Sequence, residues 1–139
     1  MKRLAIIGLI LFVGCTHMAA ERDLNRTAHR VSRMESRELR ETDTEVLLRA
    51  YKWHPEAREA IKVELARRNI IDFSSWSPIE RHKIHIGMTK EAVRLSWGDP
   101  SRINRTVGRW GIHEQWIYGR YPHAEYLYFE NNQLVGWQN

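Results

Sequence analysis

The hydrophobic pattern changes period near residue 100, and this change constrains the fold more than any other feature. Residues 89–97 carry apolar side chains at helical spacing. Thr89 is a good N-cap, whereas Gly98 and Pro100 stop a helix. Apolar and polar residues alternate from residue 102 onward, which is typical of strands. We therefore predict an α+β fold, in which an N-terminal helical segment precedes a short helix packed on a small three- to four-stranded antiparallel sheet.

The alternation divides the C-terminal segment into short strands, expected at residues 102–107, 112–118, 126–129 and 134–137. Asn131 and Asn132 tolerate the backbone of a tight hairpin. Large aromatic residues are expected to form most of the core: Trp97, Trp116, Tyr126, Tyr128, Phe129 and Trp137. Trp110 and Tyr121 fall in predicted loops, so these two aromatic side chains are the candidates for contact with a partner.

The middle of the chain reads as helical. Residues 21–68 contain no glycine and one proline, Pro55, which suits the first position of a helix. Thr42 and Glu45 have the spacing of a capping box. We expect a charged helical stalk over residues 15–41, a helical hairpin over 42–72, and the α+β domain over 73–139.

Six arginines of the stalk recur every three or four residues: Arg22, Arg26, Arg30, Arg33, Arg37 and Arg40. On one continuous helix they would fall within an arc of about 80°. Such a stripe is either a solvated helix face or a surface that binds anionic lipid head groups or an acidic partner. The binding interpretation assigns membrane or partner contact to Arg26, Arg30, Arg33, Arg37 and Arg40.

The N-terminus reads as a signal peptide over residues 1–14. Lys2 and Arg3 precede an uncharged apolar run over residues 4–14, which is shorter than the roughly 20 residues that span a bilayer. The run ends at Cys15, the only cysteine, which is either a small apolar residue of that run or a lipidation site. "FVGC" resembles a bacterial lipobox, with Phe12 in place of the usual leucine. This resemblance implies a lipid anchor on Cys15, and Thr16 after it fits sorting to the periplasmic face of the outer membrane.

The composition points to no nucleic acid, cofactor or metal. Removing Lys2 and Arg3 lowers the formal net charge from +5 to +3, since no acidic residue precedes Glu21, and this mild charge does not specify nucleic acid. His82 and His85 have metal-ligand spacing, but nothing nearby completes a ligand set. No catalytic or phosphate-binding motif is present in the sequence, so we expect a protein that is not an enzyme.

Three stretches of the C-terminal segment suggest a family: "IHIGMTKEAVRLSWGDPSRINRT", "EQWIYG" and "YLYFENNQLVGW". Together they resemble the SmpA/OmlA (BamE-like) family of outer-membrane lipoproteins over residues 83–139. The resemblance implies two helices against a three-stranded antiparallel sheet and a role in holding partners together. Residues 20–70 have no counterpart in that family, and the turn "WGDP" carries tryptophan where a shorter side chain is usual.

These features predict a non-enzymatic cell-envelope lipoprotein that acts as a protein-binding module. By the resemblance, the module would support outer-membrane protein assembly or envelope integrity as part of an envelope protein complex. Two alternatives stay open. One is a binder of anionic lipid head groups or peptidoglycan that uses the arginine stripe and the loop aromatics. The other is a periplasmic enzyme inhibitor.

Overall fold

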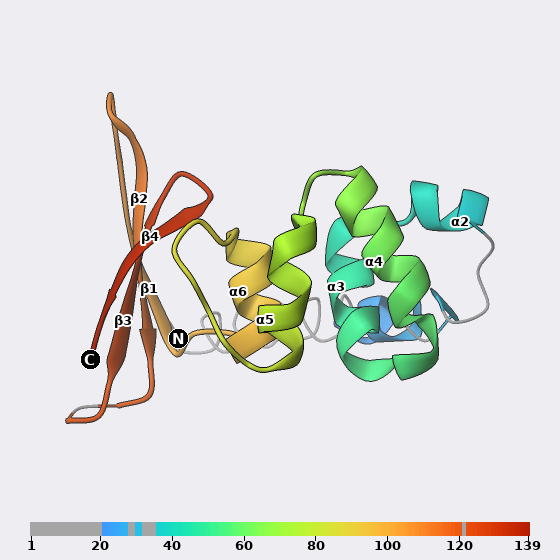
Figure 1. The fold of residues 1–139 in the computed structure, drawn as a ribbon, viewed down its shortest axis with the longest axis horizontal. Coiled ribbons are helices and arrows are strands. Elements are labelled where there is room, and N and C mark those ends of the chain that lie inside the picture. The colour runs from blue at the N-terminus through green and yellow to red at the C-terminus, as the bar shows by residue number, and fades with distance from the viewer. Residues whose placement is uncertain (1–20, 28–29, 32–35, 121) are drawn as a thin grey trace, which may run out of the picture. The chain divides into compact units, whose positions relative to one another are not determined.

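The computed structural model describes residues 21–27, 30–31, 36–120 and 122–139 (Figure 1). The fold is α+β, as predicted: helices precede one four-stranded antiparallel sheet. The chain divides into two compact units, residues 1–64 and 65–139. Within the described ranges, no helix is both long and apolar enough to cross a bilayer.

The first unit is helical. Residues 21–27 form a helix, followed by α2 (Ser36–Glu41), α3 (Thr44–Trp53), the 3₁₀ turn η2 (Pro55–Ala57) and the first part of α4 (Arg58–Arg67). The N-cap of α3 is Asp43, whose carboxylate accepts a 2.8 Å hydrogen bond from the backbone N–H of Glu45. Thr42 instead donates its hydroxyl to the Glu38 carbonyl at 2.9 Å. The cap expected at Thr42 is therefore wrong by one residue, since the carboxylate next to it takes that role.

One arginine ties the first helical segment to α3. Arg49 Nη1 lies 2.6 Å from Glu21 Oε1 and 2.8 Å from Asn25 Oδ1. The turn between α3 and α4 is held by Arg58, whose Nε donates to the Tyr51 carbonyl at 3.0 Å while its guanidinium lies over the Tyr51 ring. The apolar face of α3 is buried, as its helical spacing predicts: Val46, Leu47, Ala50 and Tyr51.

The second unit begins inside α4, at Leu65, rather than at residue 73 as the sequence suggested. The segment after α4 is bonded to this unit, because the Thr89 hydroxyl donates to the Ile70 carbonyl at 2.9 Å. The 3₁₀ turn η3 (Phe73–Ser75) and α5 (Trp76–Glu80) follow, and then α6 (Lys90–Trp97). Thr89 caps α6 and Gly98, with a φ of +85°, ends it, so both predicted helix signals are confirmed.

The sheet is an antiparallel meander in the order β1 (Arg102–Gly108), β2 (Gly111–Tyr118), β3 (Glu125–Glu130) and β4 (Gln133–Gln138). The helices α5 and α6 lie on one face of this sheet (Figure 1). Its core contains residues of the segment before α6, of α6 and of the strands, all fully buried: Met88, Val93, Leu127, Phe129 and Leu134. The number of strands, four, is the upper end of the predicted range of three to four. It is one more than the three strands that the family resemblance implies.

The predicted aromatic core is only partly right. Trp116 and Phe129 are buried with ring centroids 4.5 Å apart. Tyr126 and Tyr128 alternate with the buried residues of β3, so their side chains lie on the opposite face, where they are only half-buried. Trp137 is 52% exposed, near the end of an edge strand. A sheet with one covered face buries every second residue of its strands, which is why Tyr126 and Tyr128 stay outside the core. Trp137 pairs with the buried Leu127 and so lies on the covered face, but its position near the strand end leaves it exposed.

Candidate functional site

The two edges of the sheet differ in their backbone hydrogen bonds. The start of the outer edge of β4 is bonded to the segment before α6: Leu134 accepts from the Gly87 N–H and donates to the Met88 carbonyl, both at 2.8 Å. Thr89 and Gln133 form an isolated antiparallel bridge beside them. The outer edge of β1, which we call the β1 edge, pairs with no strand in the part of the chain that the structure describes. An unpaired strand edge offers a row of backbone donors and acceptors.

The hydrogen bonds around β2 show which backbone groups of β1 point outward. Asn131 N–H donates to the Ile112 carbonyl at 2.6 Å, so the backbone groups of Ile112 face β3. In an antiparallel ladder this direction alternates, so residues 113, 115 and 117 of β2 face β1. The 2.8 Å hydrogen bond from Ser101 N–H to the Ile117 carbonyl agrees with that assignment.

The pairing register between β2 and β1 gives the direction of the backbone groups in β1. Residues 113, 115 and 117 pair with residues 106, 104 and 102, whose backbone groups therefore face β2. The N–H and C=O groups of Ile103, Arg105 and Val107 consequently point outward along the β1 edge.

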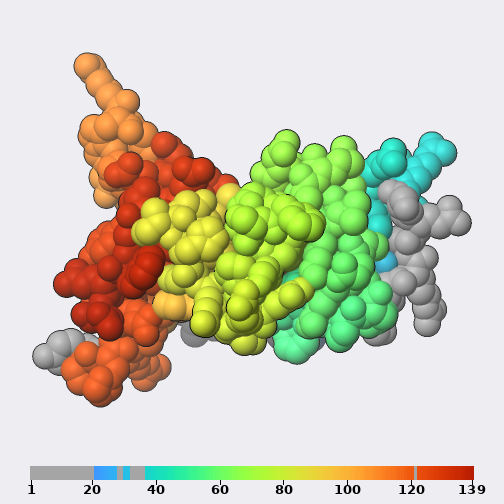
Figure 2. All heavy atoms as spheres, viewed as in Figure 1, coloured from blue at the N-terminus to red at the C-terminus, as the bar shows by residue number. Residues whose placement is uncertain are grey.

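Apolar side chains lie along the β1 edge. All seven residues of β1 are exposed, including Ile103 at 48% and Val107 at 66%. Ile103 pairs with the buried Trp116, so this row of side chains lies on the face that α6 covers elsewhere. Figure 2 shows the tip of the β1–β2 hairpin projecting beyond the rest of its unit, which explains why these side chains stay exposed.

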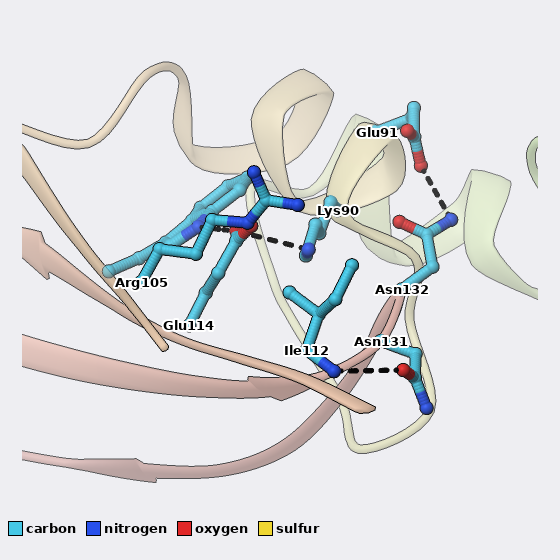
Figure 3. Close-up of polar contacts among 8 residues, drawn as sticks. Lys90, Glu91, Arg105, Ile112, Glu114, Asn131 and Asn132 are labelled. Atoms are coloured by element: carbon cyan, nitrogen blue, oxygen red, sulfur yellow. Dashed lines mark hydrogen bonds and ion pairs between the residues drawn. The ribbon is translucent and has the colours of Figure 1, made fainter. Parts of the chain in front are cut away.

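A mostly buried carboxylate anchors the base of the hairpin (Figure 3). Glu114 is 11% exposed and lies 3.0 Å from Lys90 Nζ, at the start of α6. It also accepts a 2.8 Å hydrogen bond from Trp116 Nε1 and lies 3.4 Å from Arg105 Nε. Burial acts to raise the pKa of Glu114, but these hydrogen bonds and the charges of Lys90 and Arg105 outweigh it and lower the pKa. The cluster therefore fixes β1 and β2 to α6 through an ionised carboxylate.

Trp110, the loop aromatic expected to contact a partner, sits at the hairpin tip and is 58% exposed. Its ring meets His113 edge-on with centroids 4.4 Å apart, and it leaves no room for a Cβ on Gly108, which would lie 2.5 Å from the ring. Half of Trp110 is thus packed on its own hairpin, and the remainder is available for contact.

The face of the sheet away from α6 carries a row of side-chain hydrogen bonds across all four strands. The Asn104 amide donates to the Gln115 carbonyl oxygen at 2.9 Å, and Gln115 Nε2 donates to the Tyr128 hydroxyl at 3.3 Å. Tyr128 in turn donates to Gln138 at 3.3 Å. These polar groups satisfy one another, so this row serves to hold the four strands in register.

A shallow pocket of about 410 Å³ lies at the opposite end of the sheet from the hairpin tip, lined by His82, Ser96, Trp97, Tyr118, Gly119, His123 and Glu125. Polar groups that line this pocket form hydrogen bonds within the fold. Trp97 Nε1 donates to the His82 carbonyl at 3.0 Å, and the Tyr118 hydroxyl donates to the Gly98 carbonyl at 2.9 Å. Burial raises the pKa of Tyr118, so this phenol stays neutral and its hydroxyl can donate that hydrogen bond.

The histidines with metal-ligand spacing take structural roles. His82 Nδ1 bonds the Ser96 carbonyl and His85 Nδ1 bonds the Ile86 carbonyl, both at 2.9 Å, so each of these nitrogens carries a hydrogen. Among the described residues, no group of three or more metal-ligating side chains gathers. His82 thus bonds the last turn of α6, and His85 bonds the loop before that helix.

Four of the arginines assigned to the predicted stripe lie among the described residues: Arg26, Arg30, Arg37 and Arg40. Arg26 lies in the helix of residues 21–27, and Arg30 is helical after the two undescribed residues 28–29. Arg37 and Arg40 lie in α2, and all four side chains are exposed. Arg37 Nε lies 4.0 Å from Glu41. The expected stripe member Arg33, the expected lipidation site Cys15 and the loop aromatic Tyr121 lie outside the described residues, as does the signal peptide expected at residues 1–14.

The strand pattern of the sequence does not predict the exposed β1 edge. The alternation predicts a strand that contains Ile103 and Val107, but it does not predict that both side chains are exposed. A signal was available: residues 100–113 hold three arginines and no acidic residue. An arginine-rich strand next to a loop is typical of an edge strand.

No family model matches the chain, and no curated protein or solved structure matches it.

Proposed function

We propose that this chain is a non-enzymatic cell-envelope lipoprotein of the SmpA/OmlA (BamE-like) type that binds another protein through its β1–β2 hairpin. In this proposal the chain is exported and lipidated on Cys15. It is held at the periplasmic face of the outer membrane, where it supports an envelope protein complex. The proposal combines the lipobox-like N-terminus and the three family-like stretches with one structural observation.

That observation is the projecting hairpin. It presents apolar side chains that the fold of its own unit leaves uncovered, Ile103, Val107 and Trp110, and all three are about half exposed or more. Exposed apolar groups gathered on one element mark interaction sites more often than scattered ones do. The Glu114 cluster bonds the strands of the hairpin to α6, and such prior ordering lowers the conformational entropy lost when a partner binds.

In-cell crosslinking tests the binding. A photoreactive residue in place of Trp110 is expected to form a covalent adduct with a defined envelope protein. Trp53, which is 67% exposed in the first unit, serves as the matched control position. Equal labelling from both positions, or none from Trp110, contradicts a role of the hairpin in binding.

Fractionation tests the anchor separately. Cys15→Ala is expected to move the protein from the membrane fraction to the soluble periplasmic fraction or to leave it with an uncleaved signal peptide. A variant that is cleaved and still membrane-bound would contradict lipidation.

The exposed arginines support a second candidate, binding of anionic lipid head groups. Arg26, Arg30, Arg37 and Arg40 lie on exposed helix surfaces in the part of the chain that follows the proposed anchor. Each basic side chain near an anionic surface contributes about 1 kcal/mol. Replacing Arg26 and Arg30 by glutamine is expected to weaken binding of the unlipidated chain to anionic vesicles, and equal binding to neutral vesicles would contradict this candidate.

A further inference from the structure

We propose that the β1 edge binds an extended, acidic segment of a partner protein as an added strand. This inference rests on the proposed protein-binding function and names the chemistry of the partner. It is carried by the outward backbone groups of β1, by the apolar side chains beside them and by the charge of the hairpin.

The backbone of β1 has the geometry for pairing with another strand. The outward N–H and C=O groups of Ile103, Arg105 and Val107 lie on a regular seven-residue strand that contains no proline. The same sheet already shows the geometry at its other edge, where Leu134 exchanges hydrogen bonds with Gly87 and Met88. An extended segment at β1 would repeat that arrangement with a partner chain, since exposed edges recruit strands through main-chain hydrogen bonds.

The side chains of β1 add a pattern to this pairing. Ile103 and Val107 flank Arg105 on the face shared with α6, and Arg105 is held by Glu114. A partner strand beside them places its own side chains within about 5 Å of these residues. Apolar residues at alternate positions of the partner would therefore cover Ile103 and Val107.

The charge of the hairpin selects an acidic partner. Residues 100–113 contain Arg102, Arg105 and Arg109 and no acidic residue. Within the described residues, Arg102 and Arg109 have no ion-pair partner, whereas Arg105 pairs with Glu114. Carboxylates on the partner would thus meet two available guanidinium groups, which match them in bidentate geometry.

The same charge argues against a second copy of this chain as the occupant. An antiparallel pairing that sets Ile103 against Val107 of another molecule places Arg105 directly opposite Arg105. Like charges directly opposite each other destabilise a sheet. Each copy also contributes Arg102 and Arg109, which have no ion-pair partner among the described residues, so two copies bring like charges together.

Amide hydrogen exchange measured on the full chain in detergent micelles tests the inference. In the free protein, the amides of residues 102, 104 and 106 should be protected and those of Ile103, Arg105 and Val107 should exchange fast. The probe is an acetylated eight-residue peptide of alternating valine and glutamate. Its addition should protect the three outward amides, and a peptide with lysine in place of glutamate should not.

Charge variants supply the matched control. Arg102→Glu with Arg109→Glu should weaken binding of the acidic peptide at least tenfold. Arg120→Glu, at an exposed position beyond the end of β2, should change it less than twofold. Both variants leave the backbone bonds of β1 to β2 intact, so the free-state pattern of protected amides checks that the hairpin still folds.

Three results would overturn the inference: binding of the peptide without protection of the outward amides, equal binding of the acidic and basic peptides, or no binding at millimolar concentration. Protection of these amides in the free chain that rises with protein concentration would assign the edge to a second copy instead. Crosslinking from position 110 remains a separate test. If that adduct forms while the peptide fails, the hairpin binds a partner by another mode and only the strand inference falls.

Discussion

Neutralising Glu114 is the sharpest test of how the hairpin is held. Glu114→Gln keeps the size of the side chain and an oxygen that accepts the Trp116 N–H, but it removes the charge that pairs with Lys90. Lys90 is then left 16% exposed without its carboxylate. We expect the free energy of unfolding to fall by about 2–3 kcal/mol, because a charged hydrogen bond contributes roughly 1.5–3 kcal/mol.

Arg105 adds little to this figure. Its side chain is 56% exposed, and an ion pair so open to water contributes at most about 0.5 kcal/mol. The predicted loss therefore belongs almost entirely to the Lys90–Glu114 pair. Lys90→Met combined with Glu114→Gln should cost less than the sum of the two single changes, since the pair is then removed together.

Urea unfolding followed by tryptophan fluorescence measures this loss in the second unit, because five of the six tryptophans lie after residue 64. Glu130→Gln, the same change at an exposed position of β3, serves as the control and should shift stability by less than about 0.5 kcal/mol. A Glu114→Gln variant as stable as this control would refute the anchoring role of the carboxylate.

The effect should also depend on pH. The pKa of Glu114 in the folded protein is below its ordinary value of 4.5, so ionisation stabilises the folded state above pH 4.5. This contribution is lost as the pH falls through the folded-state pKa. The stability difference between the wild type and Glu114→Gln should therefore be constant near neutral pH and should shrink in acid, and a difference that grows in acid would contradict the assignment.

Three further changes test local features of the second unit. Thr89→Ala should cost about 1–2 kcal/mol by urea unfolding because the hydroxyl both caps α6 and bonds Ile70, and Thr89→Ser should retain most of that stability. Gly111→Ala should cost more than Gly98→Ala in the same assay. Both positions have positive φ, but only at Gly111 does the new Cβ also lie 2.7 Å from a neighbouring side-chain oxygen. Leu127→Ala should lower stability by about 2–5 kcal/mol, since the side chain is fully buried under the sheet; a loss below 1 kcal/mol would contradict its place in the core.

Local signals in the sequence were enough to predict much of the second unit. Thr89, Gly98 and the alternation after residue 102 depend on neighbours within one turn or one strand, and the structure confirms the α+β fold they predicted. Asn131, with a φ of +55°, likewise turns the last hairpin as expected. Each of these features is determined by residues that are close to it in the sequence.

The features that depend on distant residues were not predictable. Alternation shows that Tyr126 and Leu127 lie on opposite faces, but it does not show which face a helix covers. Nothing in the sequence distinguishes Glu114 from the other carboxylates of the strands, because its partner Lys90 comes from another element 24 positions earlier. Ile103 and Val107 are exposed because β1 is an edge strand and because the hairpin projects from its unit. Neither fact can be predicted from the residues of the strand alone.

The hydrogen bonds at the start of β4 make the two edges of the sheet unequal for strand addition. Residues 87–90 are bonded to residues 132–134 at one end of the β4 edge, so a strand added along the whole of β4 would have to displace this segment. A strand added at β1 displaces no segment in the part of the chain that the structure describes. An intramolecular segment on one edge opposes the growth of a continuous sheet through both edges, and such growth is what makes an exposed strand the repeating unit of a fibre.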